Sequence, residues 1–169
     1  PVAAVEVAHR VGMPLTMVIK RRERAELAYW DEQVAPLLHA DDEVLEEPLE
    51  AVKLDLLARA RATLCPIDWS EPFGLVLIES MACGTPVIAR PRGAAPEVLE
   101  HGRTGFLCET VGEMVAAVRR LDELTPAACR ARVRELFSGP AMADGYERVF
   151  ARLTGDCSRP AMRIAASAA

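Results

Sequence analysis

The 169 residues are enough for one domain with a full core, because 51% of them are hydrophobic. The formal net charge of −5 gives no support for a nucleic-acid partner. No apolar run reaches membrane-spanning length, no signal peptide is found, and the five cysteines and three histidines are scattered, so we expect a cytoplasmic protein with reduced thiols and no metal site.

The first part of the chain alternates between helical and strand patterns. Apolar residues at helical spacing predict helices over Val2–Val11, Glu23–Leu38 and Leu49–Ala60. Short apolar runs predict strands over Pro14–Ile19, Glu43–Glu46 and Ala62–Pro66. The first of these strands ends in a basic cluster, formed by Lys20, Arg21, Arg22 and Arg24.

The second part continues the alternation. Strands are predicted over Thr85–Ala89 and Gly105–Cys108. Capping residues and apolar spacing predict helices that begin near Leu75, Pro96, Thr110, Thr125 and Ser138. The last helix ends near Leu153, so we expect a folded domain over residues 1–154 and a flexible tail over 155–169.

Alternating strands and helices predict an α/β fold, a Rossmann-like doubly wound parallel sheet with helices on both faces. Ligands bind such sheets at the carboxyl ends of the strands. Lys20, the turn after Val44 and the loop that carries Glu71 all follow strands. We therefore expect these three segments to share one crevice.

The stretch Trp69–Ala89 contains the features that point to chemistry. Gly74 precedes a helix whose first amides favour an anion such as phosphate. Glu71 lies before that helix and Glu79 within it, and carboxylates accept hydrogen bonds from vicinal hydroxyls. Two carboxylates that flank a phosphate site fit a nucleotide sugar, although two glutamates at this spacing are, on spacing alone, more often solvated helix residues.

The wider stretch EPFGLVLIESMACGTPVIA resembles the sugar-nucleotide domain of retaining GT-B glycosyltransferases of the GT4-like family, also called group 1. The hallmark is two glutamates separated by seven residues, with EPFG at the start and GTPVI at the end. Further matches are ARATLCP, PEVLEHGRTGFL and FSGPAMADGYERVF. The resemblance runs from about Val2 to Leu153 and implies the C-terminal half of a GT-B enzyme.

The resemblance assigns the transferred sugar to the EPFG turn. It implies that Glu71 contacts the hydroxyls of the sugar and acts as the catalytic glutamate, orienting the sugar rather than serving as nucleophile. The backbone amides of Phe73, Gly74 and Leu75 are implied to meet the sugar and the diphosphate.

The nucleoside part is assigned to other positions. Glu79 matches the glutamate that binds the ribose hydroxyls, and Val44 and Leu45 fall where the family backbone holds the base. Lys20 lies near a position that is often lysine or glycine in the family, and a basic residue at a strand end is also commonly just solvated.

The chain also departs from the family. The family domain begins one strand earlier, with a loop that supplies an arginine and a lysine for the diphosphate, and it is preceded by an acceptor-binding domain. Glu46 and Ile19 stand where the family usually has glycine. We therefore expect this piece alone to be inactive, and to lack its first strand and its acceptor-domain partner.

The resemblance implies metal-independent hexosyl transfer with retention, from a nucleotide-diphosphate sugar and without a cofactor, and leaves open a place at the inner membrane face for the intact enzyme. Two alternatives stay open. One is a non-catalytic module that self-associates through its truncated sheet edge. The other is a GT-B sugar-nucleotide epimerase, against which EPFG argues. The sugar, the base and the acceptor are not determined by the sequence.

Overall fold

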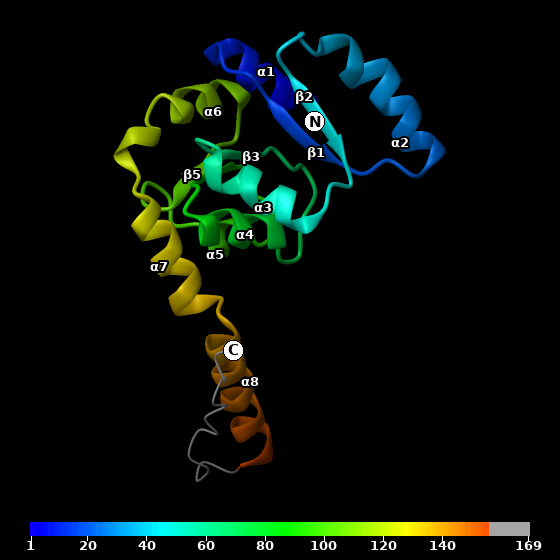
Figure 1. Cartoon of the computed structure of the whole chain (residues 1–169). Coiled ribbons are helices and arrows are strands. Elements are labelled where there is room, and N and C mark those ends of the chain that lie inside the picture. The colour runs from blue at the N-terminus through cyan, green and yellow to red at the C-terminus, as the bar shows by residue number, and fades with distance from the viewer. Residues whose placement is uncertain (156–169) are drawn as a thin grey trace.

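Short parallel strands and the helices that cover them make up residues 1–155, the part of the chain that the computed structural model describes (Figure 1). The first half contains α1 (Val2–Val11), β1 (Thr16–Ile19), α2 (Arg24–Tyr29), β2 (Glu43–Glu46), α3 (Glu50–Arg59) and β3 (Thr63–Cys65). The second half contains α4 (Leu75–Cys83), β4 (Val87–Ala89), α5 (Ala95–Val98), β5 (Gly105–Leu107), α6 (Val111–Val118), α7 (Pro126–Leu136) and α8 (Gly139–Thr154).

One predicted helix, Glu23–Leu38, is not regular. Only α2 is α-helical; a π-turn over Trp30–Val34 and a 3-10 turn over Ala35–Leu37 follow it. Pro36 explains the change, because it has no N–H to donate to a carbonyl of the preceding turn. The wider π-turn also buries both Trp30 and Val34, which pack with Met17 of β1.

The strands are all parallel, as predicted, but they form two sheets rather than one. β1 pairs with β2 in the first sheet, with Met17 opposite Val44. The second sheet has the order β3-β4-β5. Among the described strands, β1 pairs only with β2, and β3 pairs only with β4. The expected single sheet is therefore divided between β1 and β3.

Helices cover both faces of the three-stranded sheet, which confirms the predicted layering. Alternate residues of β4 point to opposite faces. Val87 and Ala89 belong to a core that includes Leu77 and Met81 of α4. Ile88 belongs to a second core, with side chains from α6 and α1.

Helix α1 connects the two sheets. Val7, which is fully buried, packs in the core on the α6 side of the three-stranded sheet. Val5 packs instead against Met17 and Trp30 in the core of the two-stranded sheet. The two sheets are therefore held together by apolar packing on one helix.

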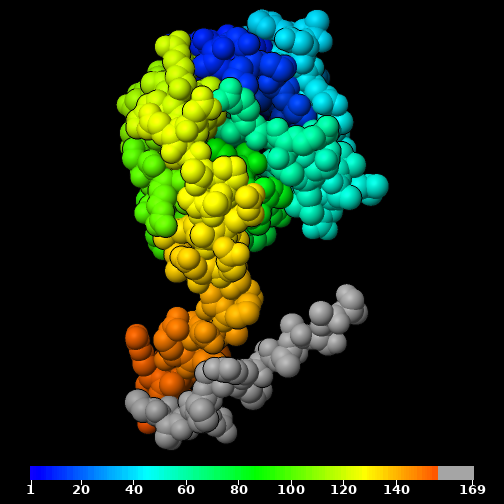
Figure 2. All heavy atoms as spheres, turned by 60° about the vertical axis from the view of Figure 1, so that its left-hand side comes forward, coloured from blue at the N-terminus to red at the C-terminus, as the bar shows by residue number. Residues whose placement is uncertain are grey.

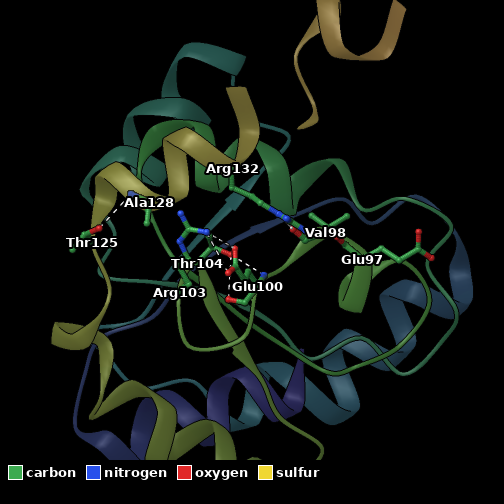
Figure 3. A network of polar contacts seen from close by, with 8 residues as sticks. All are labelled: Glu97, Val98, Glu100, Arg103, Thr104, Thr125, Ala128 and Arg132. Atoms are coloured by element: carbon green, nitrogen blue, oxygen red, sulfur yellow. Dashed lines mark hydrogen bonds and ion pairs between the residues drawn. The ribbon is translucent and has the colours of Figure 1, made fainter. Parts of the chain in front are cut away.

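Helix α7 fastens α5 in place. Arg132 donates from Nε to the carbonyl oxygen of Val98 at 3.2 Å and from Nη2 to that of Glu97 at 2.8 Å (Figure 3). The buried hydroxyl of Thr104 accepts the Glu100 amide at 3.0 Å in the same network. These bonds satisfy carbonyls at the end of a short helix and fix the segment that follows β4.

Helix α8 extends away from the rest of the described chain (Figures 1 and 2). It has no buried residue. Its large apolar side chains are exposed and recur at helical spacing: Met142, Tyr146, Val149, Phe150 and Leu153. Apart from Gly155, the expected tail over 155–169 lies outside the described residues. No helix within residues 1–155 is long and apolar enough to cross a membrane.

Candidate functional site

The loop that follows β3 carries Glu71 and is fixed by the loop that follows β4. The carbonyl oxygen of Glu71 accepts the Ala94 amide at 2.8 Å. The Glu71 side chain is oriented by Trp69, whose Nε1 donates to Oε2 at 3.1 Å. Two neighbouring strand ends thus meet at Glu71, as the fold class predicts.

Helix α4 begins directly beside this glutamate. Gly74 caps it with φ of +77°, a left-handed conformation that glycine adopts without strain. The amides of Leu75 and Val76 make no hydrogen bond to any other part of residues 1–155. These free donors and the helix dipole favour an anionic group in front of the turn.

A cavity of about 230 Å³ lies between these elements. Its lining includes Glu71, Gly74 and Leu75 from the α4 side and Arg90 and Arg92 from the end of β4. Burial, and secondarily the Glu71 charge, raise the pKa of the Cys65 thiol, which also lines this cavity, to about 11. The cavity therefore combines a carboxylate, free amides and two guanidinium groups, without a reactive thiolate.

A second cavity, of about 260 Å³, is also lined by the Glu71 loop, from Ser70 to Phe73. Phe73 lines it and packs edge-on against Phe137, with 6.2 Å between ring centroids. This contact ties the EPFG turn to the end of α7. The Phe73 side chain thus has a packing role, whatever its backbone binds.

Glu79 lies on α4 and forms an ion pair with α3. Lys53 Nζ lies 3.1 Å and 3.0 Å from the two carboxylate oxygens of Glu79, and both side chains are about one-third exposed. The sequence analysis did not single out Lys53. No local pattern could have found it, because the contact depends on how α3 packs against α4.

The remaining candidates lie on the two-stranded sheet. Val44 packs in the core beside Met17, and Leu45, next to it on β2, is half-buried. Lys20 is exposed and has no hydrogen bond or ion pair within residues 1–155. None of these three residues lines either cavity at the Glu71 loop.

One group of described side chains is close enough to hold a metal ion, and it is remote in sequence from the Glu71 loop. The candidate ligand atoms of His9, His39 and Asp42 lie within 4.8 Å of one another. Burial disfavours the ionised Asp42, but hydrogen bonds from His39, His9 and Leu15 outweigh it and lower its pKa below the usual value. Those same bonds fasten the turn before β2.

A family model described as "Glycosyl transferases group 1" matches residues 48–132, about half of the chain, including the Glu71–Glu79 segment and every residue that lines the first cavity. The chain belongs to the group 1 glycosyltransferase family. Its α/β fold with parallel strands matches the C-terminal half of GT-B glycosyltransferases. The family resemblance stated from the sequence is therefore confirmed.

Curated relatives are much longer than this group 1 glycosyltransferase chain. It is 36% identical over 126 residues to N-acetyl-alpha-D-glucosaminyl L-malate synthase of Bacillus anthracis. The aligned region is 70% of this chain and 33% of that protein. It is 43% identical over 84 residues to a glycogen synthase of Mycobacterium tuberculosis, which covers 48% of this chain and 20% of the relative. The chain thus spans a third or less of these two relatives.

The solved structures that resemble this chain are also longer than it. Sucrose-phosphate synthase from Thermosynechococcus elongatus superimposes with a TM-score of 0.70 and 26% identity, over 90% of this chain and 42% of that one. The Anabaena protein HepE, solved in complex with UDP-glucose, superimposes with a TM-score of 0.69 and 20% identity, over 90% of this chain and 44% of that one. Because the identity to HepE is only 20%, this similarity shows a shared fold and nothing more.

The position of Glu71 depends on the absence of a side chain at Gly93. A Cβ on Gly93 would lie 2.2 Å from the Glu71 carbonyl oxygen and 2.4 Å from its amide nitrogen, and φ is +52°. We expect Gly93→Ala to lower the free energy of unfolding by about 2 kcal/mol or more, measured by urea denaturation.

Gly112→Ala is the control for that variant. Gly112 lies in α6, and the nearest atom to its added Cβ would be the Thr110 hydroxyl at 3.8 Å. This change should raise the unfolding free energy by up to about 1 kcal/mol. Equal stability of Gly93→Ala and the unsubstituted chain would contradict the packing described for the two loops.

Proposed function

We propose that this chain is the donor-binding domain of a retaining glycosyltransferase, which transfers a sugar from a nucleotide-diphosphate sugar to an acceptor. The observation that carries the proposal is the cavity that Glu71 shares with the free amides at the start of α4. Family membership supports it. Membership of this family also favours a transferase over the epimerase alternative.

The two halves of the cavity fit different parts of such a donor. The amides of Phe73, Gly74 and Leu75 provide hydrogen-bond donors for the diphosphate, in a place where the helix dipole favours negative charge. The Glu71 carboxylate accepts hydrogen bonds from the sugar hydroxyls, and Trp69 holds it in position.

The nucleoside is assigned to the α3 and β2 side. Glu79 accepts hydrogen bonds from the ribose hydroxyls, while Lys53 keeps its carboxylate in place. The backbone of Val44 and Leu45 would contact the base from β2, and Lys20 would lie at the edge of that site.

The reaction consistent with these groups is a front-face displacement. The bond between the anomeric carbon and the diphosphate oxygen breaks, the acceptor oxygen bonds to the same face of that carbon, and the departing diphosphate takes the acceptor proton. Glu71 orients the sugar and stabilises oxocarbenium-like positive charge. Backbone amides stabilise the leaving group, so no metal is assigned to this step.

The rest of a longer protein would supply the acceptor site. We propose that the 169 residues bind the donor weakly and do not turn it over, because they contain one side of the expected cleft. Detectable sugar transfer by this chain alone would contradict that part of the proposal.

The proposal is tested by calorimetric titration of the chain with UDP-, GDP- and ADP-sugars, beside Glu79→Gln. We expect one nucleotide to bind, and Glu79→Gln to weaken its binding about tenfold, because a charge-assisted hydrogen bond to ribose is lost.

Glu123→Gln is the matched control, since Glu123 forms an exposed ion pair with Arg120 away from both cavities. It should leave binding unchanged. Failure of every nucleotide sugar to bind, or equal effects of the two variants, would count against the proposed site.

A second role is favoured by α8. The exposed apolar residues of this helix, from Met142 to Leu153, span about three turns and are not buried by any part of residues 1–155. We propose that it packs against the remainder of a longer protein, and that isolated copies of this chain associate through it. This surface differs from the truncated sheet edge through which the sequence analysis expected a non-catalytic module to self-associate.

The molecular mass of the chain, measured by light scattering at several protein concentrations, tests this second role. The unsubstituted chain should show a mass that rises with concentration, and the double variant Tyr146→Ser/Phe150→Ser should remain a monomer. The control is Asp144→Ser/Arg148→Ser, which changes the opposite face of α8 and leaves the net charge unaltered. A monomer at every concentration for all three chains would refute self-association through α8.

A further inference from the structure

Glu79 is the one charged residue of α4, and it lies close in sequence to the free amides at the start of that helix. It follows Leu75 and Val76, which line the first cavity, by four and three residues, and it therefore shares a face of the helix with them. The Cα–Cβ bonds of a helix are tilted toward its N-terminus, which here is the turn assigned to the diphosphate. An uncompensated carboxylate in this place would repel an anionic ligand.

Lys53 supplies the compensating charge. Its Nζ lies 3.1 Å and 3.0 Å from the two carboxylate oxygens of Glu79, and within residues 1–155 it is the one cation in ion-pair contact with Glu79. Each side chain is only 31% exposed, so solvent screens this pair less than it screens a surface pair. A carboxylate has about four acceptor sites, so Glu79 can be paired with Lys53 and still accept hydrogen bonds from hydroxyls.

The other carboxylate of the proposed site has different surroundings. Glu71 lines a cavity that is also lined by two arginines, Arg90 and Arg92. Glu79 does not line that cavity, and its partner Lys53 comes from a separate helix, α3. The charge of Glu79 is thus compensated by one side chain, which a single substitution removes.

We propose that Lys53 makes the donor site selective for anions: by neutralising Glu79, it lets a nucleoside diphosphate bind where an unpaired carboxylate would favour an uncharged nucleoside. Lys53 acts through Glu79, so it is a positioning residue rather than a group that touches the donor. The inference rests on the proposed function, which assigns the ribose to Glu79 and the diphosphate to the α4 amides.

The test is calorimetric titration of the 169-residue chain with nucleoside, nucleoside monophosphate and nucleoside diphosphate, in the uridine, guanosine and adenosine series. Lys53→Met removes the charge and keeps an apolar stem. In the series of the preferred base, we expect it to weaken the diphosphate about tenfold or more, the monophosphate less and the nucleoside least, because repulsion by Glu79 grows with ligand charge. If the nucleoside binds too weakly to titrate, the two phosphates make the comparison.

Salt and further substitutions separate an effect of charge from an effect of shape. Raising the salt concentration from about 0.05 M to about 0.5 M should shrink the loss caused by Lys53→Met, because the Debye length falls below about 10 Å. The double variant Lys53→Met/Glu79→Gln should lose the dependence on ligand charge, because neither charge of the pair remains. Lys53→Arg keeps the cation and should bind the diphosphate nearly as well as the unsubstituted chain.

Arg59→Met is the matched control. Arg59 lies on the same helix as Lys53, forms an exposed ion pair with Asp55 and lines neither cavity. This variant changes the net charge of the chain by the same amount, and it should leave all three affinities unchanged. Circular dichroism checks that each variant folds, and Lys53→Gln replaces Lys53→Met if Lys53→Met does not fold.

Three results would overturn the inference. An equal loss of all three ligands with Lys53→Met, or no loss, would leave the proposed function intact and limit Lys53 to orienting Glu79. The same graded loss with Arg59→Met would make the effect one of net charge. If no nucleotide binds to the unsubstituted chain, the proposed donor site fails and this inference fails with it.

Discussion

The site depends on one backbone hydrogen bond, from the amide of Ala94 to the carbonyl oxygen of Glu71. It joins the loop after β3 to the loop after β4, so that two strand ends line one cavity. Gly93 allows the approach, because any Cβ there would collide with the Glu71 backbone. Arg132 stabilises the same region by donating hydrogen bonds to two carbonyl oxygens of α5. Disturbing this contact would move Glu71 relative to the α4 amides.

The proposed donor site contains two carboxylates in different surroundings. Glu79 forms an ion pair with Lys53 of α3, whereas Glu71 lines a cavity together with the first residues of α4. The proposal assigns the ribose to Glu79, the diphosphate to the α4 amides and the hexose to Glu71. Its basis is chemical, because carboxylates accept hydrogen bonds from hydroxyls and amides donate them to phosphate.

Features with local causes could be predicted from the sequence. Gly74 before an apolar helix, Gly84 after it, and strands between turn residues each leave a short pattern, and the structure contains these elements. Features that depend on packing could not be predicted. The Lys53–Glu79 pair joins residues 26 apart, and the π-turn at Trp30 reflects both Pro36 and the core. The division into two sheets is likewise non-local, because strand pairing has no signature within one strand.

The central claim is that Glu71 contacts the sugar and not the nucleotide, and the most direct measurement is the affinity of the chain for a nucleotide sugar against the corresponding free nucleoside diphosphate, with and without Glu71→Gln. We predict that the unsubstituted chain binds the nucleotide sugar more tightly than the diphosphate, and that Glu71→Gln removes this difference by weakening the sugar form alone. Equal weakening of both ligands by Glu71→Gln would contradict the account, because it would place Glu71 at the nucleotide.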